Sequence, residues 1–111
     1  MNINPINAFE VIEELVEEVE LELLALAGKP VPHAKRYIFK VNDRRGVSEK
    51  RKITGAEILT ITKFDPPKNF TLSMKREKHW VPVKLHEEVN LGQPGIECFR
   101  ANPNDATDGS S

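Results

Sequence analysis

Hydrophobic residues recur every three or four positions through the first quarter of the chain, which is the spacing of one face of an α-helix. We therefore predict a single amphipathic helix within residues 1–28, running from residue 4 to residue 27. Asn4 is suited to cap this helix, Pro5 suits its first turn, and Gly28 suits its end. Six large residues form its apolar seam: Phe9, Ile12, Val16, Val19, Leu23 and Leu26.

We expect the seam to be buried against another surface, because burying a large apolar side chain is favourable by roughly 1.5–3 kcal/mol. Two arrangements provide one: packing against the rest of the chain, or docking into a groove on a partner. Glutamates flank the seam on both sides, and their repulsion disfavours a parallel homodimer. A homo-oligomer formed through this helix stands as a further alternative. Residues 29–34 contain two prolines and form a short linker.

Beyond the linker, apolar and polar residues alternate and predict a β-hairpin. Residues 35–41 form a strand, and residues 42–46 form a turn in which Gly46 adopts a positive φ. Residues 48–53 return as a weaker, basic strand. The inward-facing residues of the first strand are Tyr37, Phe39 and Val41.

A short helix follows the hairpin. Thr54 is its N-cap, and Glu57 three residues later completes a capping box. Pro66 and Pro67 prevent the helix from continuing. A third strand then covers residues 71–76, with Leu72 and Met74 sharing its inner face.

The last part of the chain predicts an edge strand at 81–85, since Pro82 removes one backbone donor there. Residues 85–91 form a short helical turn, and residues 96–100 form the final strand. Residues 101–111 are small and polar, so we expect a disordered tail.

Several short motifs within residues 35–100 resemble those of the bacterial multiubiquitin-domain family. They are Ile-Thr-Gly-Ala-Glu-Ile-Leu at 53–59, Asp-Pro-Pro at 65–67, Leu-His-Glu-Glu-Val-Asn-Leu at 85–91, and the Pro94-Gly95 pair that leads to Phe99. The predicted fold class is α+β: a ubiquitin-like β-grasp over 35–100, with the long N-terminal amphipathic helix and the disordered C-terminal tail added. The expected core residues are Ile53, Ile58, Leu59, Leu72, Met74, Leu85, Leu91, Ile96 and Cys98.

The net charge of −1 conceals strong segregation along the chain. Residues 1–28 carry −7, residues 29–84 carry +10, and residues 85–111 carry −4. This asymmetry suggests an acidic arm facing a basic body, or two separate partner surfaces. Charged faces that are merely solvated are the alternative.

Composition gives little support to catalysis. The sequence holds no phosphate-binding glycine loop and no zinc motif, so we expect no enzyme activity, cofactor or metal. Cys98, the single cysteine, is predicted to point inward as an inert thiol. Basic clusters at 50–52 and 75–78 lie near a single tryptophan, which is weak support for nucleic-acid binding and favours an acidic protein surface as partner. Without a long apolar run or a basic leader, we expect a cytoplasmic protein that does not contact membranes.

The resemblance implies a protein modifier that acts through its tail. Its partners would be activating and conjugating enzymes and a processing protease. Such a tail must end in glycine, and the only tail glycine is Gly109, so we expect cleavage after it. The alternative is an unconjugated adaptor that recruits a protein through its N-terminal helix or its basic face.

Ubiquitin presents an apolar patch on its third and last strands. With Leu72 and Met74 pointing inward here, Ser73 stands at the centre of that patch and the patch is diminished. We therefore expect a partner to recognise a different set of side chains: Trp80, Phe99, Lys75 and Arg76.

Overall fold

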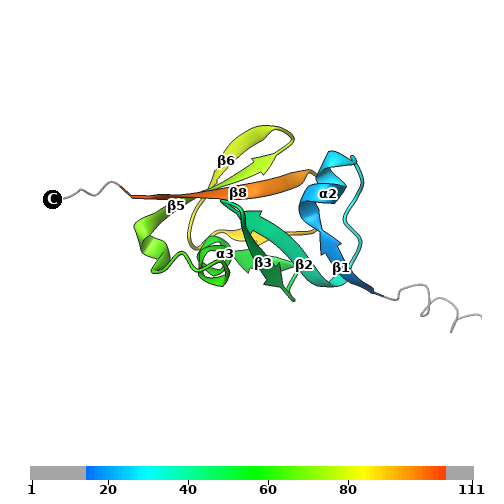
Figure 1. Cartoon of the computed structure of the whole chain (residues 1–111), viewed down its shortest axis with the longest axis horizontal. Coiled ribbons are helices and arrows are strands. Elements are labelled where there is room, and N and C mark those ends of the chain that lie inside the picture. The colour runs from blue at the N-terminus through cyan, green and yellow to red at the C-terminus, as the bar shows by residue number, and fades with distance from the viewer. Residues whose placement is uncertain (1–14, 105–111) are drawn as a thin grey trace, which may run out of the picture.

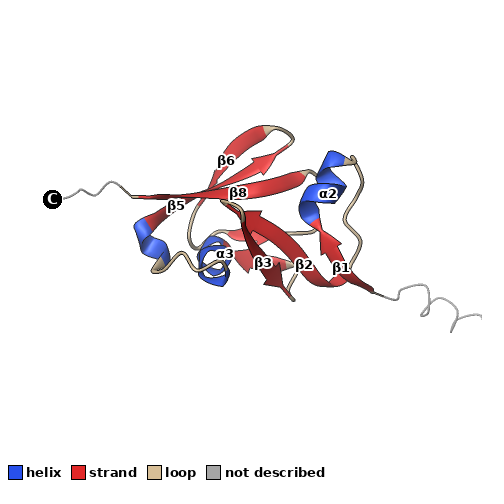
Figure 2. Cartoon of the chain, viewed as in Figure 1, coloured by secondary structure: helices blue, strands red, loops and turns tan. Residues whose placement is uncertain are grey.

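A computed structural model describes residues 15–104. Strands dominate these residues, and both α-helices are short (Figures 1 and 2). The strands are β1 (Val16–Glu20), β2 (Ala34–Val41), β3 (Arg44–Ser48), β4 (Lys52–Thr54), β5 (Phe70–Arg76), β6 (His79–Val83), β7 (Glu88–Asn90) and β8 (Ile96–Pro103). The helices are α2 (Leu21–Leu26), α3 (Gly55–Ile61) and the 3₁₀ turn η1 (Pro67–Asn69).

Six of the strands form one mixed sheet in the order β1-β2-β8-β5-β6, with β3 paired to the other edge of β2. The two central strands, β2 and β8, run parallel but pair only at Val41 and Phe99. Helix α2 packs against both of them and fills the wedge where they diverge (Figure 1). Strands β4 and β7 form a separate two-stranded sheet. The core includes Ile58 and Leu59 of α3 and the inner face of the large sheet.

The predicted fold class is wrong in its long N-terminal helix. Residues 16–20 are instead a strand, β1, which pairs in parallel with residues 34–38 of β2. Strands account for 49% of the described chain, and the helix that follows β1 has only six residues. The edge of β2 offers backbone partners that outweigh the local helical pattern, and two valines suit a strand. Glu17 meets Lys35 and Arg36 at 3.0 Å each, which orients the two strands.

The apolar seam is correspondingly not one face of a helix. Only Val19 among its described members is buried, whereas Leu21, which lies outside the predicted seam, is 1% exposed. Phe9 and Ile12 lie outside the described residues. The exposed seam residues are Val16, Leu23 and Leu26.

The hairpin between β2 and β3 turns earlier than the sequence pattern suggests. Asn42 and Asp43 form the turn, with φ values of 50° and 77°, which is typical of a type I′ hairpin. Gly46 lies within β3, opposite Phe39. A Cβ atom on Gly46 would lie 2.7 Å from the Phe39 ring and 2.9 Å from Thr62. Glycine is therefore needed for close packing at this position and not for the turn.

The predicted capping box of the central helix is confirmed. Thr54 Oγ1 accepts a hydrogen bond from the Glu57 N–H at 3.2 Å, and Glu57 Oε1 accepts one from the Thr54 N–H at 2.8 Å. The predicted helical turn at 85–91 is wrong. That segment contains β7, which pairs with β4, while its first residues accept hydrogen bonds from the Gly55 and Ala56 N–H groups.

A β-bulge changes which residues of β8 face the core. The register between β5 and β8 shifts between Lys75 and Arg76, so Ile96 and Phe99 both point inward although they are three residues apart. Cys98 consequently faces the other side of the sheet and is half-buried, and its predicted core position is wrong. Of the remaining expected core residues, Leu85 is partly buried and the others are buried: Ile53, Ile58, Leu59, Leu72, Met74, Leu91 and Ile96.

Ordered structure also continues beyond the predicted end of the last strand. Ala101 is 2% exposed, and the Asn42 side-chain amide bonds both its N–H and its carbonyl, at 3.0 and 2.7 Å. The chain is held as far as Asn104, whose N–H donates to the Asn69 carbonyl at 2.8 Å. The expectation of disorder from residue 101 onward is wrong for residues 101–104. Gly109 lies outside the described residues.

Candidate partner-binding surfaces

Trp80 is the centre of the first candidate surface, on the face of the sheet opposite the core. It lies in the edge strand β6 and is 39% exposed. The Arg100 guanidinium lies 4.1 Å from the centre of its ring, and Lys75 Nζ lies 5.9 Å from it. These cations sit within the range of a cation–π interaction and hold the indole against the sheet. The surface formed by Trp80, Lys75 and Arg100 is called the Trp80 face below.

Two residues predicted for this surface lie elsewhere. Phe99 is buried, with its ring packed edge-on to Phe39 at a centroid distance of 5.7 Å. Arg76 donates from Nε to the Pro94 carbonyl at 3.1 Å, at the loop that leads into β8. Arg100 was not predicted for this surface. It lies in β8 and Trp80 lies in β6, and the two side chains meet only because both strands pair with β5.

The Trp80 face adjoins a shallow hollow of about 220 Å³ between α2 and β8. This volume is below the range usual for small-molecule sites. Lys40 in its wall pairs with Glu22 at 3.3 Å. Burial raises the pKa of the Cys98 thiol in the same hollow, which favours its protonated form. The hollow therefore suits polar contacts with a partner better than a reaction at the Cys98 thiol.

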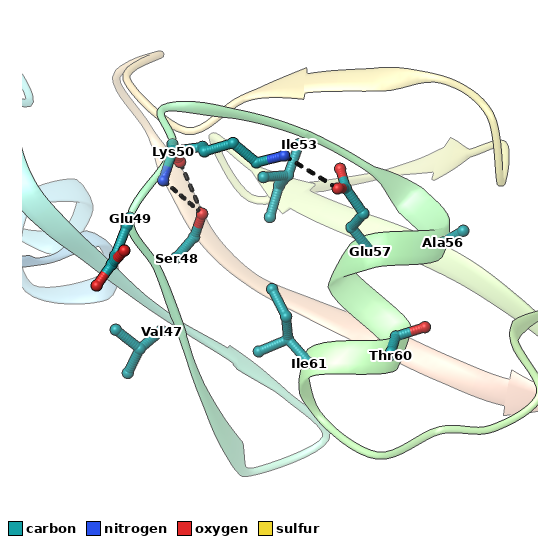
Figure 3. Close-up of a pocket in the computed structure, with 9 residues that line it drawn as sticks. All are labelled: Val47, Ser48, Glu49, Lys50, Ile53, Ala56, Glu57, Thr60 and Ile61. Atoms are coloured by element: carbon teal, nitrogen blue, oxygen red, sulfur yellow. Dashed lines mark hydrogen bonds and ion pairs between the residues drawn. The ribbon is translucent and has the colours of Figure 1, made fainter.

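A second candidate surface is a groove of about 640 Å³ between β3 and α3 (Figure 3). Its walls come from two segments, 47–53 and 56–61, that the fold brings side by side. Periodicity in either segment alone gives no sign of the groove. Lys50 spans one end and pairs with Glu57 at 3.1 Å. The lining residues are Val47, Ser48, Glu49, Lys50, Ile53, Ala56, Glu57, Thr60 and Ile61.

The root of the tail is the third feature. Strand β8 ends at Pro103, and both Pro103 and Asn104 are exposed. Asn104 Nδ2 donates to the Lys68 carbonyl at 2.8 Å, and Thr71 Oγ1 donates to Asn104 Oδ1 at 2.6 Å. The segment that carries Gly109 thus starts from an anchored point on the surface, at the end of β8 seen at the left in Figure 1.

Within residues 15–104, no group of three or more His, Cys, Asp or Glu side chains is arranged to hold a metal ion. No helix in the same range is long and apolar enough to cross a membrane.

Comparison with known proteins gives one match. No curated protein and no solved structure matches the chain. The sequence profile of the family described as multiubiquitin matches residues 37–104, which is more than half of the chain and runs from β2 to the root of the tail. A multiubiquitin domain indicates a small ubiquitin-like module with a β-grasp fold. The chain therefore belongs to the multiubiquitin family.

Proposed function

We propose that this protein is a ubiquitin-like modifier, or the precursor of one, activated through its C-terminal tail. In this role it is the substrate of activating and conjugating enzymes and of a processing protease. Membership of the multiubiquitin family supports the proposal. The single structural observation that carries it is the root of the tail, where β8 ends exposed and tied to Lys68 and Asn69.

The length of the tail suits this role. Gly109 lies five residues beyond Asn104. At about 3.3–3.6 Å per extended residue, its carboxyl group reaches roughly 17 Å from the root. Five residues are therefore enough to carry Gly109 clear of the sheet, as a tail that enters an activating enzyme must be.

The chemistry requires three steps. A protease hydrolyses the peptide bond after Gly109, which consumes one water and leaves a glycine carboxylate. The activating enzyme then couples that carboxylate to ATP, which gives an acyl adenylate and releases pyrophosphate. Transfer of the acyl group to an amine forms an amide bond and releases AMP and a proton. A glycine suits the channel because it has no β-carbon to clash with the walls.

The test is the mass of the mature protein purified from its native cell. The proposal predicts a species that ends at Gly109 and a set of larger adducts. Gly109→Val should abolish both, and the matched tail substitution Ala106→Val should preserve both. Neither change should alter thermal unfolding, since the core ends at β8. Uncleaved full-length protein, or adducts that survive Gly109→Val, would contradict the proposal.

An unconjugated adaptor is the second candidate, and the Trp80 face favours it. An exposed tryptophan held between two cations is typical of a binding hot spot, and its positive surroundings suit an acidic protein partner. The adaptor model predicts that Trp80→Ala abolishes capture of a partner that Gly109→Val still captures. Loss of capture with the tail variant and not with the Trp80 variant would exclude it.

A further inference from the structure

Helix α2 presents two leucines to solvent. Leu23 and Leu26 are 61% and 67% exposed, the highest values among the large apolar side chains of residues 15–104. They lie three residues apart and therefore share one side of the helix, next to the exposed Ala27. The other side holds α2 to the domain, since Leu21 is 1% exposed and Leu24 packs against the core. The surface formed by Leu23, Leu26 and Ala27 is called the α2 face below.

Opposite charges stand at the two ends of the α2 face. Glu20 directly precedes the helix, as its N-cap residue. At the other end, Gly28 has a φ of 68° and the Lys29 N–H donates to the Leu24 carbonyl at 2.9 Å, so the cap fixes the backbone of Lys29. In the part of the chain that the structure describes, neither Glu20 nor Lys29 takes part in an ion pair.

This order of side chains is complementary to itself when it is reversed. A two-fold axis midway between Leu23 and Leu26 relates two antiparallel α2 helices and places Leu23 of one copy opposite Leu26 of the other. The same axis places Glu20 level with Lys29 of the other copy, and it does so twice. A parallel pair would instead set Glu20 beside Glu20 and Lys29 beside Lys29, which is repulsive. The charges therefore favour an antiparallel second copy as the occupant of the α2 face.

The position of α2 leaves room for such a contact. It precedes the family match, which begins at residue 37, so the α2 face is an addition to the multiubiquitin domain. Figure 1 shows α2 at the end of the domain opposite to the end of β8, where the tail begins. Two copies joined through α2 thus keep the ends of both β8 strands clear of the contact.

We propose that the α2 face binds the α2 face of a second copy of this chain in an antiparallel arrangement. The leucines of the two copies pack on each other, and two Glu20–Lys29 pairs flank them. The face is small beside the about 800 Å² that each partner buries in a standard interface. We therefore expect a weak dimer, with a dissociation constant on the order of 100 µM. This contact goes beyond the proposed modifier role, because it requires neither Gly109 nor cleavage of the tail.

The experiment uses the full chain labelled with nitrogen-15, at concentrations from about 10 µM to about 1 mM, which bracket the expected dissociation constant. Sedimentation velocity should show a monomer at the low end of this range and a rapidly exchanging dimer at the high end. The amide signals that move with concentration should cluster in residues 20–29.

Three leucine variants locate the contact. Leu23→Ser and Leu26→Ser should each weaken the dimer at least fivefold. Leu15→Ser is the matched control, because this leucine is 47% exposed but lies before β1, at the end of that strand away from α2, and it should leave the affinity unchanged. Since all three leucines are exposed, no variant should lower the melting temperature by more than about 4 °C.

Charge variants test the antiparallel arrangement. Glu20→Lys or Lys29→Glu alone replaces two attractive pairs by two repulsive ones and should weaken the dimer about fivefold. The double variant Glu20→Lys with Lys29→Glu restores opposite charges, and its affinity should return to within about twofold of the parent value. The exchanged charges oppose the helix dipole, so this recovery cannot come from a more stable helix.

Four results would overturn the proposal. The first is a parent protein that stays monomeric at the highest concentration, and the second is a dimer that Leu23→Ser leaves unchanged. The third is a folded double charge variant whose affinity stays as low as that of the single variants. The fourth is a monomer in which Leu23→Ser lowers the melting temperature well beyond Leu15→Ser. That last result would assign the α2 face to residues 1–14 of the same chain.

Discussion

The β-bulge in β8 predicts opposite consequences for two adjacent residues. Phe99 is 2% exposed and packs edge-on against Phe39, whereas Cys98 faces the other side of the sheet. Truncating a buried phenylalanine to alanine costs about 3–5 kcal/mol. Because a domain of this size is stable by about 5–15 kcal/mol, Phe99→Ala is expected to fold only marginally or not at all.

Phe99→Leu is the gentler perturbation. It keeps an apolar side chain in the core and loses the aromatic pair with Phe39, a loss of about 0.5–1.5 kcal/mol. Cys98→Ala is the matched control, because the half-buried thiol faces away from the core and its removal should cost less than about 1 kcal/mol. Leu72→Ala serves as the reference for a buried inner-face residue, at about 2–5 kcal/mol.

The assay is equilibrium unfolding in urea, followed by Trp80 fluorescence and by far-UV circular dichroism. Trp80 is a sensitive reporter, since its ring lies 4.1 Å from the Arg100 guanidinium in the folded state only. The bulge would be refuted if Phe99→Ala unfolded within about 0.5 kcal/mol of the parent protein while Cys98→Ala lost about 2 kcal/mol or more. That pattern would restore the simple alternation in which Cys98 faces the core.

Three further outcomes are expected. Gly55→Ala should destabilise the protein by about 1–3 kcal/mol in the same urea assay, because its Cβ would lie 2.4 Å from the Lys84 carbonyl oxygen. An unchanged urea midpoint would contradict this, since it would mean that the backbone at Lys84 moves away without cost. The pKa of Glu57 is lowered from its ordinary 4.5, first by the hydrogen bond from the Thr54 N–H, so its charge adds stability above pH 4.5 that is lost as the pH falls through the folded-state pKa. Glu57→Gln should therefore lower the melting temperature at pH 7, and the difference should shrink toward pH 3; a constant difference would contradict this. Since burial raises the pKa of Cys98, alkylation by iodoacetamide at pH 8, measured by mass, should be slower in the folded protein than in urea, and equal rates would contradict the burial.

Local features were predictable where they depend only on residues that are close together in the sequence. The capping box is one example, because Thr54 and Glu57 satisfy each other's backbone within a single turn. The inner face of β5 is another, since Leu72 and Met74 follow the two-residue period of a strand with no irregularity between them. One of the family motifs, at 53–59, contains this capping box, and all of them are short runs of neighbouring residues, which explains why the resemblance to the multiubiquitin family was visible in the sequence.

The candidate surfaces were only partly predictable. Trp80 and Lys75 were found because they flank one turn, and the sequence alone shows that both are near a basic cluster. Arg100 was missed because it reaches Trp80 across two strand registers, and the groove between β3 and α3 was missed because its walls are separate segments.

The sequence by itself thus determined the capping box, the inner face of β5 and the family. Tertiary structure decided whatever depends on a partner far away in the chain. Residues 16–20 have a helical apolar pattern but become a strand, because the free edge of β2 supplies backbone partners and basic side chains that no local pattern contains. Gly46 is required by the Phe39 ring that lies opposite it, and Phe99 faces the core because a bulge against β5 shifts its register. Side-chain periodicity describes only one strand or helix, whereas pairing between strands sets which face and which edge each residue finally occupies.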